Sequence, residues 1–160
     1  MKPAIHAAAG VVAMLTVLTF WMSTAISELF FSQEAIAVVK QAILYGMLVL
    51  IPAMAITGAS GFSLGGKRKG RLVDDKKWRM RIIALNGLLV MLPSAFFLDG
   101  KASVGELDGP FYVVQPIELS VGLAQLFLMG KNFRDGLRLA GRLRSLRLAH
   151  RGSDHDVQPS

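Results

Sequence analysis

The sequence predicts an all-α fold, an integral membrane four-helix bundle that ends in an amphipathic helix on the cytoplasmic side. Four apolar stretches approach or exceed the roughly 20 residues that a helix needs to cross a bilayer. Their apolar residues do not alternate with polar ones, as residues 11–15 and 88–92 illustrate, so helices are favoured over membrane β-strands. The charged residues, 18% of the chain, are concentrated between these stretches, which is typical of a membrane protein.

The predicted spans cover about residues 4–29, 35–64, 80–98 and 111–130, and residues 1–131 form one transmembrane domain. The first span has one charge, Glu28, at its far end, and the second has only Lys40, near its start. The third is the shortest, and the fourth contains Glu118. Residues 132–151 are predicted to form a basic amphipathic helix, and residues 152–160 a disordered tail.

The connections are marked by composition. Glycine and basic residues at 65–70 predict a break after the second span. Residues 99–110, with three glycines, predict a polar loop before the fourth span. The first span is longer than the apolar core of a usual signal peptide, so we expect it to be retained.

Lysine and arginine are distributed unevenly between the connections. Of the 18 basic residues, eight lie in residues 67–81 and seven in residues 131–151. Basic residues stay preferentially on the cytoplasmic side, so the second connection and both termini are predicted to be cytoplasmic. We expect a multi-pass protein of the bacterial inner membrane, with the other two connections in the periplasm. Because topology accounts for the positive charge, no nucleic-acid partner is predicted.

The sequence excludes several kinds of chemistry. It contains no cysteine, so disulfides, thiolate nucleophiles and cysteine-held zinc or iron–sulfur clusters are absent. Its three histidines are His6, His150 and His155, too few for an all-protein metal site. No metal site and no catalytic residue are predicted.

Two spans carry small and polar residues in steps of three and four, which places them on one helix face. In the fourth span these are Gln115, Glu118, Gly122, Gln125, Met129 and Asn132. In the first span they are His6, Ala9, Ala13, Thr16, Phe20, Ser23 and Ser27. Such faces pack against other helices, because lipid gains nothing from covering them. The alternative is that they line a cavity or a cofactor site.

An intramembrane ion pair is predicted between Lys40 and Glu118. Both lie within a few turns of the same predicted periplasmic end of their spans. A glutamate in lipid needs a partner, a proton or an inward orientation, and Lys40 is the cation that could reach it. The pair is compatible with either a structural bridge or a functional site.

A second group of polar side chains is expected in the cytoplasmic half of the spans: His6, Thr57, Ser60, Asn86 and Gln125. His6 is either a haem ligand or an interfacial histidine hydrogen-bonded to Asn86. Since the other histidines lie in the tail, a haem b within one chain would be held by His6 with Met54 or Met129. The candidate cofactor-binding residues are His6, Met54, Asn86, Gln125 and Met129.

Four segments carry a family resemblance: Phe20-Trp21 with Ser27-Glu28, Ile51-Pro52-Ala53-Met54, residues 92–98 and residues 128–137. Over nearly the whole chain they resemble a group of small uncharacterised bacterial four-span inner-membrane proteins, which implies the fold but no activity. His6, Phe20-Trp21 and Pro52-Ala53-Met54 are also similar to HemJ-type protoporphyrinogen oxidases and related four-span haem proteins. That likeness implies a haem-ligand role for His6.

Three classes of function remain open, with a non-catalytic role favoured over an enzyme. The first is a haem- or quinone-associated redox protein, the second an accessory or assembly subunit of a larger membrane complex, and the third a small transporter or channel. Besides the lipid bilayer, the expected partners are a membrane protein or a second copy of the chain. Anionic lipid headgroups are expected to contact Arg134, Arg138, Arg142 and Arg147.

Overall fold

The computed structural model describes residues 2–65 and 71–155, and in them almost every residue is helical. The helices are α1 (Lys2–Phe30), α2 (Gln33–Gly65), α3 (Arg71–Asn86), the π-helix η1 (Gly87–Met91), α4 (Leu92–Ser103) and α5 (Gly109–His155). Because α3, η1 and α4 follow one another without an interruption, they form one span. The chain is therefore an all-α bundle of four long helical rods.

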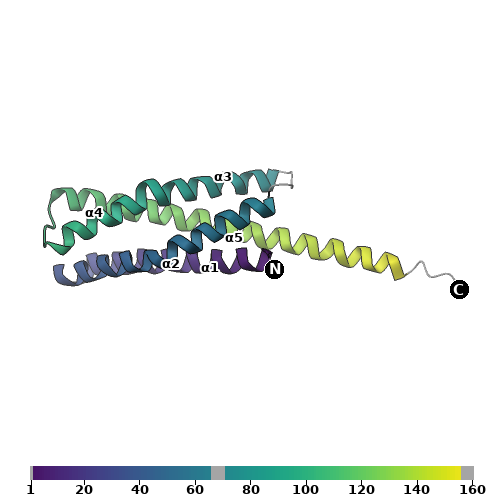
Figure 1. Cartoon of the computed structure of the whole chain (residues 1–160), viewed down its shortest axis with the longest axis horizontal. Coiled ribbons are helices and arrows are strands. Elements are labelled where there is room, and N and C mark those ends of the chain that lie inside the picture. Colours follow the sequence, from purple (N-terminus) through teal and green to yellow (C-terminus); the bar gives the residue numbers. More distant parts are fainter. Residues whose placement is uncertain (1, 66–70, 156–160) are drawn as a thin grey trace.

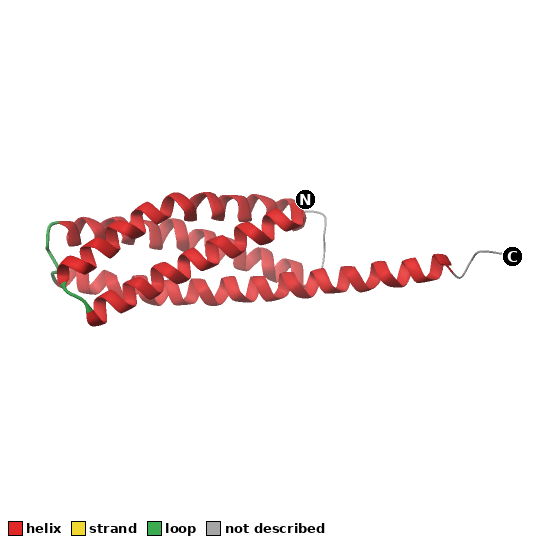
Figure 2. Cartoon of the chain, turned by 90° about the horizontal axis from the view of Figure 1, so that it is seen from below, coloured by secondary structure: helices red, strands yellow, loops and turns green. Residues whose placement is uncertain are grey.

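The four rods run alternately up and down, so the two short connections, between α1 and α2 and between α4 and α5, lie at the same end of the bundle (Figures 1 and 2). We call this the loop end. Each rod contains a candidate membrane span: Ala4–Phe30, Gln33–Gly61, Asp74–Ser103 and Gly109–Arg138. The predicted four-span architecture is confirmed.

The distribution of side chains is that of a protein in lipid. Large apolar side chains face outward on every rod, and Leu48 on α2 is 74% exposed. Polar and charged side chains are buried instead, including Lys40 at 2% and Gln125 at 2% exposure. In water this arrangement would expose apolar surface and bury charge, whereas a bilayer favours it because lipid solvates the outer face.

Several boundaries differ from those predicted. The third span was predicted at residues 80–98, but its helix begins at Arg71 and ends at Ser103. The polar loop predicted at 99–110 is consequently reduced to residues 104–108. Charged residues tolerate a helix as well as a loop, and short polar helical turns commonly extend a span beyond the lipid.

The predicted C-terminal amphipathic helix is not a separate element. α5 continues through residue 131 as far as His155, well beyond the bundle (Figure 1). Gly136 and Gly141 lower helix propensity by about 1 kcal/mol each, and neither interrupts the helix. Of the predicted tail, residues 152–155 continue α5 and residues 156–160 lie outside the described residues.

The π-helix η1 ends at Met91, two residues before Pro93. Proline has no N–H to donate, and its ring clashes with the carbonyl four residues earlier. A π-turn adds one residue and relieves such a clash; the N–H of Leu92 accordingly bonds to the carbonyl oxygen of Gly87, five residues before it. The third span therefore has a widened turn near its middle.

Candidate functional site

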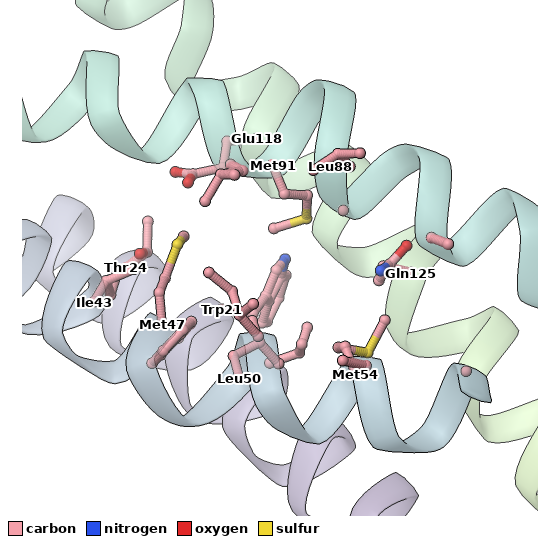
Figure 3. A pocket seen from close by; sticks show the side chains of 18 of the residues that line it. Trp21, Thr24, Ile43, Met47, Leu50, Met54, Leu88, Met91, Glu118 and Gln125 are labelled. Atoms are coloured by element: carbon pink, nitrogen blue, oxygen red, sulfur yellow. The ribbon is translucent and has the colours of Figure 1, made fainter. Parts of the chain in front are cut away.

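A cavity of about 450 Å³ lies inside the bundle, near the level of η1 (Figure 3). All four rods contribute to its wall, which consists mainly of aliphatic, aromatic and methionine side chains. The lining residues are Val17, Phe20, Trp21, Thr24, Ile43, Met47, Leu50, Ile51, Met54, Ala55, Gly58, Ala59, Ala84, Gly87, Leu88, Met91, Leu92, Glu118, Leu119 and Gln125. This volume and composition are typical of a site for a small apolar molecule.

The cavity is partly open to the outside of the bundle, and both α2 and the third span contribute exposed residues to its lining. α2 approaches α3 and α4, but among the described residues no Cα atom of α2 lies within 8 Å of one in η1. On both sides of this gap the lining residues reach the surface, since Ile51 is 52% and Leu88 62% exposed. Both residues lie within candidate membrane spans, so this exposed part of the lining is at the depth where lipid is expected.

Hydrogen bonds hold the polar part of the cavity wall in place. The Trp21 indole N–H donates to the carbonyl oxygen of Leu119 at 2.8 Å, which ties α1 to α5. The Gln125 amide Nε2 donates to the carbonyl oxygen of Ile83 at 3.0 Å, which ties α5 to α3. These two hydrogen bonds hold α1, α5 and α3 together around the cavity.

Lys40 and Glu118 meet at the end of the cavity nearest the loop end. Lys40 Nζ donates to Glu118 Oε2 at 3.1 Å, and the two side chains are 2% and 9% exposed. Glu118 also lines the cavity. A charge pair this deeply buried requires good geometry to offset the cost of its desolvation.

More polar side chains surround this ion pair. On α1, Thr24 is 3% exposed and Ser27 fully buried, and on α5, Gln115 is 3% exposed. Both amide atoms of the Gln115 side chain and Oε1 of Glu28 are buried. None of these three atoms has a hydrogen-bond partner among the described residues. Buried polar atoms without protein partners are commonly satisfied by internal water. The loop-end half of the bundle interior is therefore polar.

The predicted cofactor-binding residues are brought together only in part. Met54 and Gln125 line the cavity, and Met54 also packs against the apolar cluster that contains Met129. His6 and Asn86 are not among the lining residues. The haem assignment therefore stays a prediction, and we derive no haem chemistry from these positions.

His6 has a different partner from the one predicted. Its Nδ1 lies 3.1 Å from the carbonyl oxygen of Thr57 and 3.0 Å from Ser60 Oγ. A carbonyl oxygen accepts, so Nδ1 carries the proton. The bond ties the start of α1 to α2, next to Gly61, where a Cβ would come within 3.1 Å of the imidazole. His6 therefore packs against α2 instead of Asn86.

The sequence analysis missed a second buried charge pair, at the end opposite the loop end. Arg79 on α3 forms an ion pair with Asp135 on α5, and its Nε donates to Asn132 Oδ1 at 2.9 Å. Asp135 is only 6% exposed. Arg79 was assigned to a cytoplasmic connection and Asp135 to an exposed amphipathic helix, so an ion pair between them was not predicted. The i, i+3 spacing of Asn132 and Asp135 was the available signal.

At the loop end Lys101 joins α4 to the start of α5. Its Nζ donates to Glu106 Oε2 at 2.7 Å and to Asp108 Oδ2 at 2.8 Å. The hydrogen bond from Lys101 lowers the pKa of the exposed Asp108 carboxyl, and the N–H of Phe111 lowers it further. Asp108 Oδ1 accepts this N–H at 3.3 Å, so the carboxylate also caps the N-terminus of α5.

Fold and cavity together define the class: a small multi-pass membrane protein of four helices with a mainly apolar, partly open cavity between them. No family model, curated protein or solved structure matches the chain. The resemblances to small bacterial four-span proteins and to HemJ-type haem proteins therefore stay predictions.

Proposed function

We propose that this protein binds a lipid-soluble molecule of the quinone class in its cavity, as a redox-associated protein of the bacterial inner membrane. The observation that carries the proposal is a mainly apolar, partly open cavity within the candidate membrane spans, whose lining includes the exposed Ile51 on α2 and Leu88 on η1. A quinone ring is flat and apolar with polar oxygens, and its tail stays in lipid. An apolar wall with a few convergent polar groups, here Glu118 and Gln125, suits such a molecule.

Tryptophan fluorescence provides the test, because Trp21 lines the cavity and the only other tryptophan, Trp78, lies 62% exposed on α3. In a Trp78→Phe background, decylubiquinone is expected to quench Trp21 with a saturable dependence on its concentration in the bilayer. Gly58→Leu should weaken this binding roughly tenfold or more. A Cβ at Gly58 has no atom within 4 Å, so the new side chain enters the cavity without forcing the helices apart.

Gly130→Leu is the matched control. It is also a helical glycine whose Cβ would meet nothing within 4 Å, and it is not a lining residue. Quenching by this variant should equal that of the Trp78→Phe parent. Quenching that rises linearly without saturation, to the same extent in all three proteins, would show only partitioning into lipid and would contradict the proposal.

A second candidate function, an accessory subunit of a larger complex, is favoured by the part of α5 that extends past the bundle (Figure 1). Arg134 and Arg138 on this segment are exposed, and the side chains of Arg142 and Arg147 lie outside the described ones. With the predicted orientation, residues 132–151 would meet anionic lipid headgroups or a partner protein at the cytoplasmic surface.

The orientation itself follows from the bias of basic residues. Reporter fusions after Lys69 and at Ser160 are expected to report the cytoplasm, and a fusion after Ser103 the periplasm. The described fold places the end of α2, the start of α3 and the extension of α5 at the same end of the bundle, so the reporters at Lys69 and Ser160 are expected to agree. A periplasmic signal from Ser160 would reverse the proposed orientation.

A further inference from the structure

Two hydrogen-bond acceptors in the cavity wall have capacity left for a bound molecule. Gln125 lines the cavity and is 2% exposed, and its Oε1 is buried without a hydrogen-bond partner among the described residues. Glu118 also lines the cavity, and its Oε2 accepts a hydrogen bond from Lys40 Nζ at 3.1 Å. A carboxylate has about four lone-pair sites, so Glu118 can accept further hydrogen bonds.

The bond to Ile83 determines which end of the Gln125 amide stays free. A carbonyl oxygen can only accept, so the amide atom 3.0 Å from the carbonyl oxygen of Ile83 is the donor Nε2. This nitrogen also lies against η1, since a Cβ at Gly87 would lie 3.6 Å from it. Turning the amide over would lose the bond and place two acceptors against each other. Oε1 is therefore held as the unpartnered atom.

The donors of the cavity wall are largely used within the protein. The indole N–H, the one donor of the Trp21 side chain, is bonded to the carbonyl oxygen of Leu119 at 2.8 Å. Of the two N–H groups on Gln125 Nε2, one is bonded to Ile83. The hydroxyl of Thr24, which also lines the cavity, can donate or accept. The polar part of the wall therefore offers more free acceptors than free donors.

The spacing of the two acceptors suits a ring with a polar group at each end. Glu118 and Gln125 lie about two helical turns apart on α5, so their Cα atoms are separated by about 10 Å along the axis. They lie at opposite ends of the cavity, with Trp21 and Met91 between them (Figure 3). A six-membered ring with two para hydroxyl groups has a similar length, once a hydrogen bond of about 2.7 Å is added at each end.

We propose that the cavity binds the reduced, dihydroxy form of a quinone-class molecule in preference to the oxidised form, an inference that rests on the proposed function. The two hydroxyl groups of the reduced form donate to Gln125 Oε1 and to a carboxylate oxygen of Glu118. The oxidised form has carbonyl oxygens at the same positions, which only accept. It still binds through the apolar wall but leaves both acceptors unpaired, and a site built for a donor discriminates against a ligand that lacks it.

Competition for the site that quenches Trp21 tests this preference. In the Trp78→Phe background, without oxygen, decylubiquinol should displace decylubiquinone with a dissociation constant about tenfold lower than that of decylubiquinone itself. The dimethyl ether of decylubiquinol keeps the ring and the tail but has no O–H group, so it should lose this advantage. Gln125→Leu should weaken decylubiquinol binding about tenfold and change decylubiquinone binding by less than about twofold. Gln115→Leu is the matched control, because Gln115 is 3% exposed on the same helix and is not a lining residue.

Equal dissociation constants for the two redox forms would overturn the preference, and that measurement needs no substitution in the cavity wall. So would a dimethyl ether that competes as well as decylubiquinol, or a loss of decylubiquinol binding that is the same in Gln115→Leu as in Gln125→Leu. In each of these cases saturable quenching by decylubiquinone remains, and the proposed function stands. Absence of saturable quenching by decylubiquinone would instead contradict the proposed function itself.

Discussion

Lys40→Met is expected to destabilise the folded protein by about 3–5 kcal/mol, the typical cost of removing one partner of a buried ion pair. Lys40 is 2% exposed and forms the ion pair with Glu118. Without Lys40, the buried Glu118 carboxylate loses this partner. Methionine is close to the lysine stem in size, so packing is largely preserved. The free energy of unfolding can be measured by titrating detergent-solubilised protein with a denaturing detergent.

Glu118→Gln should also destabilise the protein, because it leaves the buried Lys40 ammonium without its carboxylate partner. The double variant should therefore be more stable than the sum of the single losses predicts. Lys101→Met is the matched control: its ion pairs with Glu106 and Asp108 lie at the exposed loop end, where such pairs contribute little. Equal losses for Lys40→Met and Lys101→Met would be incompatible with a buried pair.

Span number, helical class and the inward face of the fourth helix could be predicted from the sequence. Gln115, Glu118, Gln125 and Met129 recur at helical spacing, and all four are buried. Such a pattern predicts the buried face of a helix because a polar residue that faces lipid is costly at nearly every depth. For the same reason the position of a charge within a span restricts its partners, as the short distance between Lys40 and Glu118 illustrates.

Features that depend on how helices meet could not be predicted. The cavity depends on how the four rods pack around it, and the π-turn that contributes to its wall leaves no trace in apolar periodicity. His6 and Met54 both lie where a cofactor residue was expected, but only Met54 reaches the cavity. The position of a residue along its span predicts its depth in the membrane. It does not determine which side of the bundle the side chain faces.

Helix ends were the other weakness, and Arg79 shows the physical reason. A basic residue near a membrane surface satisfies the rule for cytoplasmic connections whether it faces water or an acid on a neighbouring helix. The rule therefore counts Arg79 towards the predicted cytoplasmic side and says nothing about Asp135. Only the packing of α3 against α5 reveals the contact between these two residues.

Arg79→Met is expected to destabilise the protein by about 3 kcal/mol, at the lower end of the range for a broken buried pair. It leaves the Asp135 carboxylate, 6% exposed, without its partner and removes the bond to Asn132. The loss is at the lower end because Lys76 also attracts Asp135 and can partly replace the guanidinium. In Arg79→Met, hydrogen exchange should accelerate in the part of α5 that follows Asp135, where the helix leaves the bundle.

Arg81→Met removes the same charge two residues away from an exposed position, so its effect should stay within about 0.5 kcal/mol. Asp135→Asn in the Arg79→Met background should restore part of the lost stability, because a neutral amide costs far less to bury than a carboxylate. If Arg79→Met and Arg81→Met lowered the free energy of unfolding equally, the specific contact between Arg79 and Asp135 would contribute nothing to stability. Recovery in the double variant would instead assign the loss to the unpaired carboxylate and establish Arg79 as the residue that fixes α5 to α3.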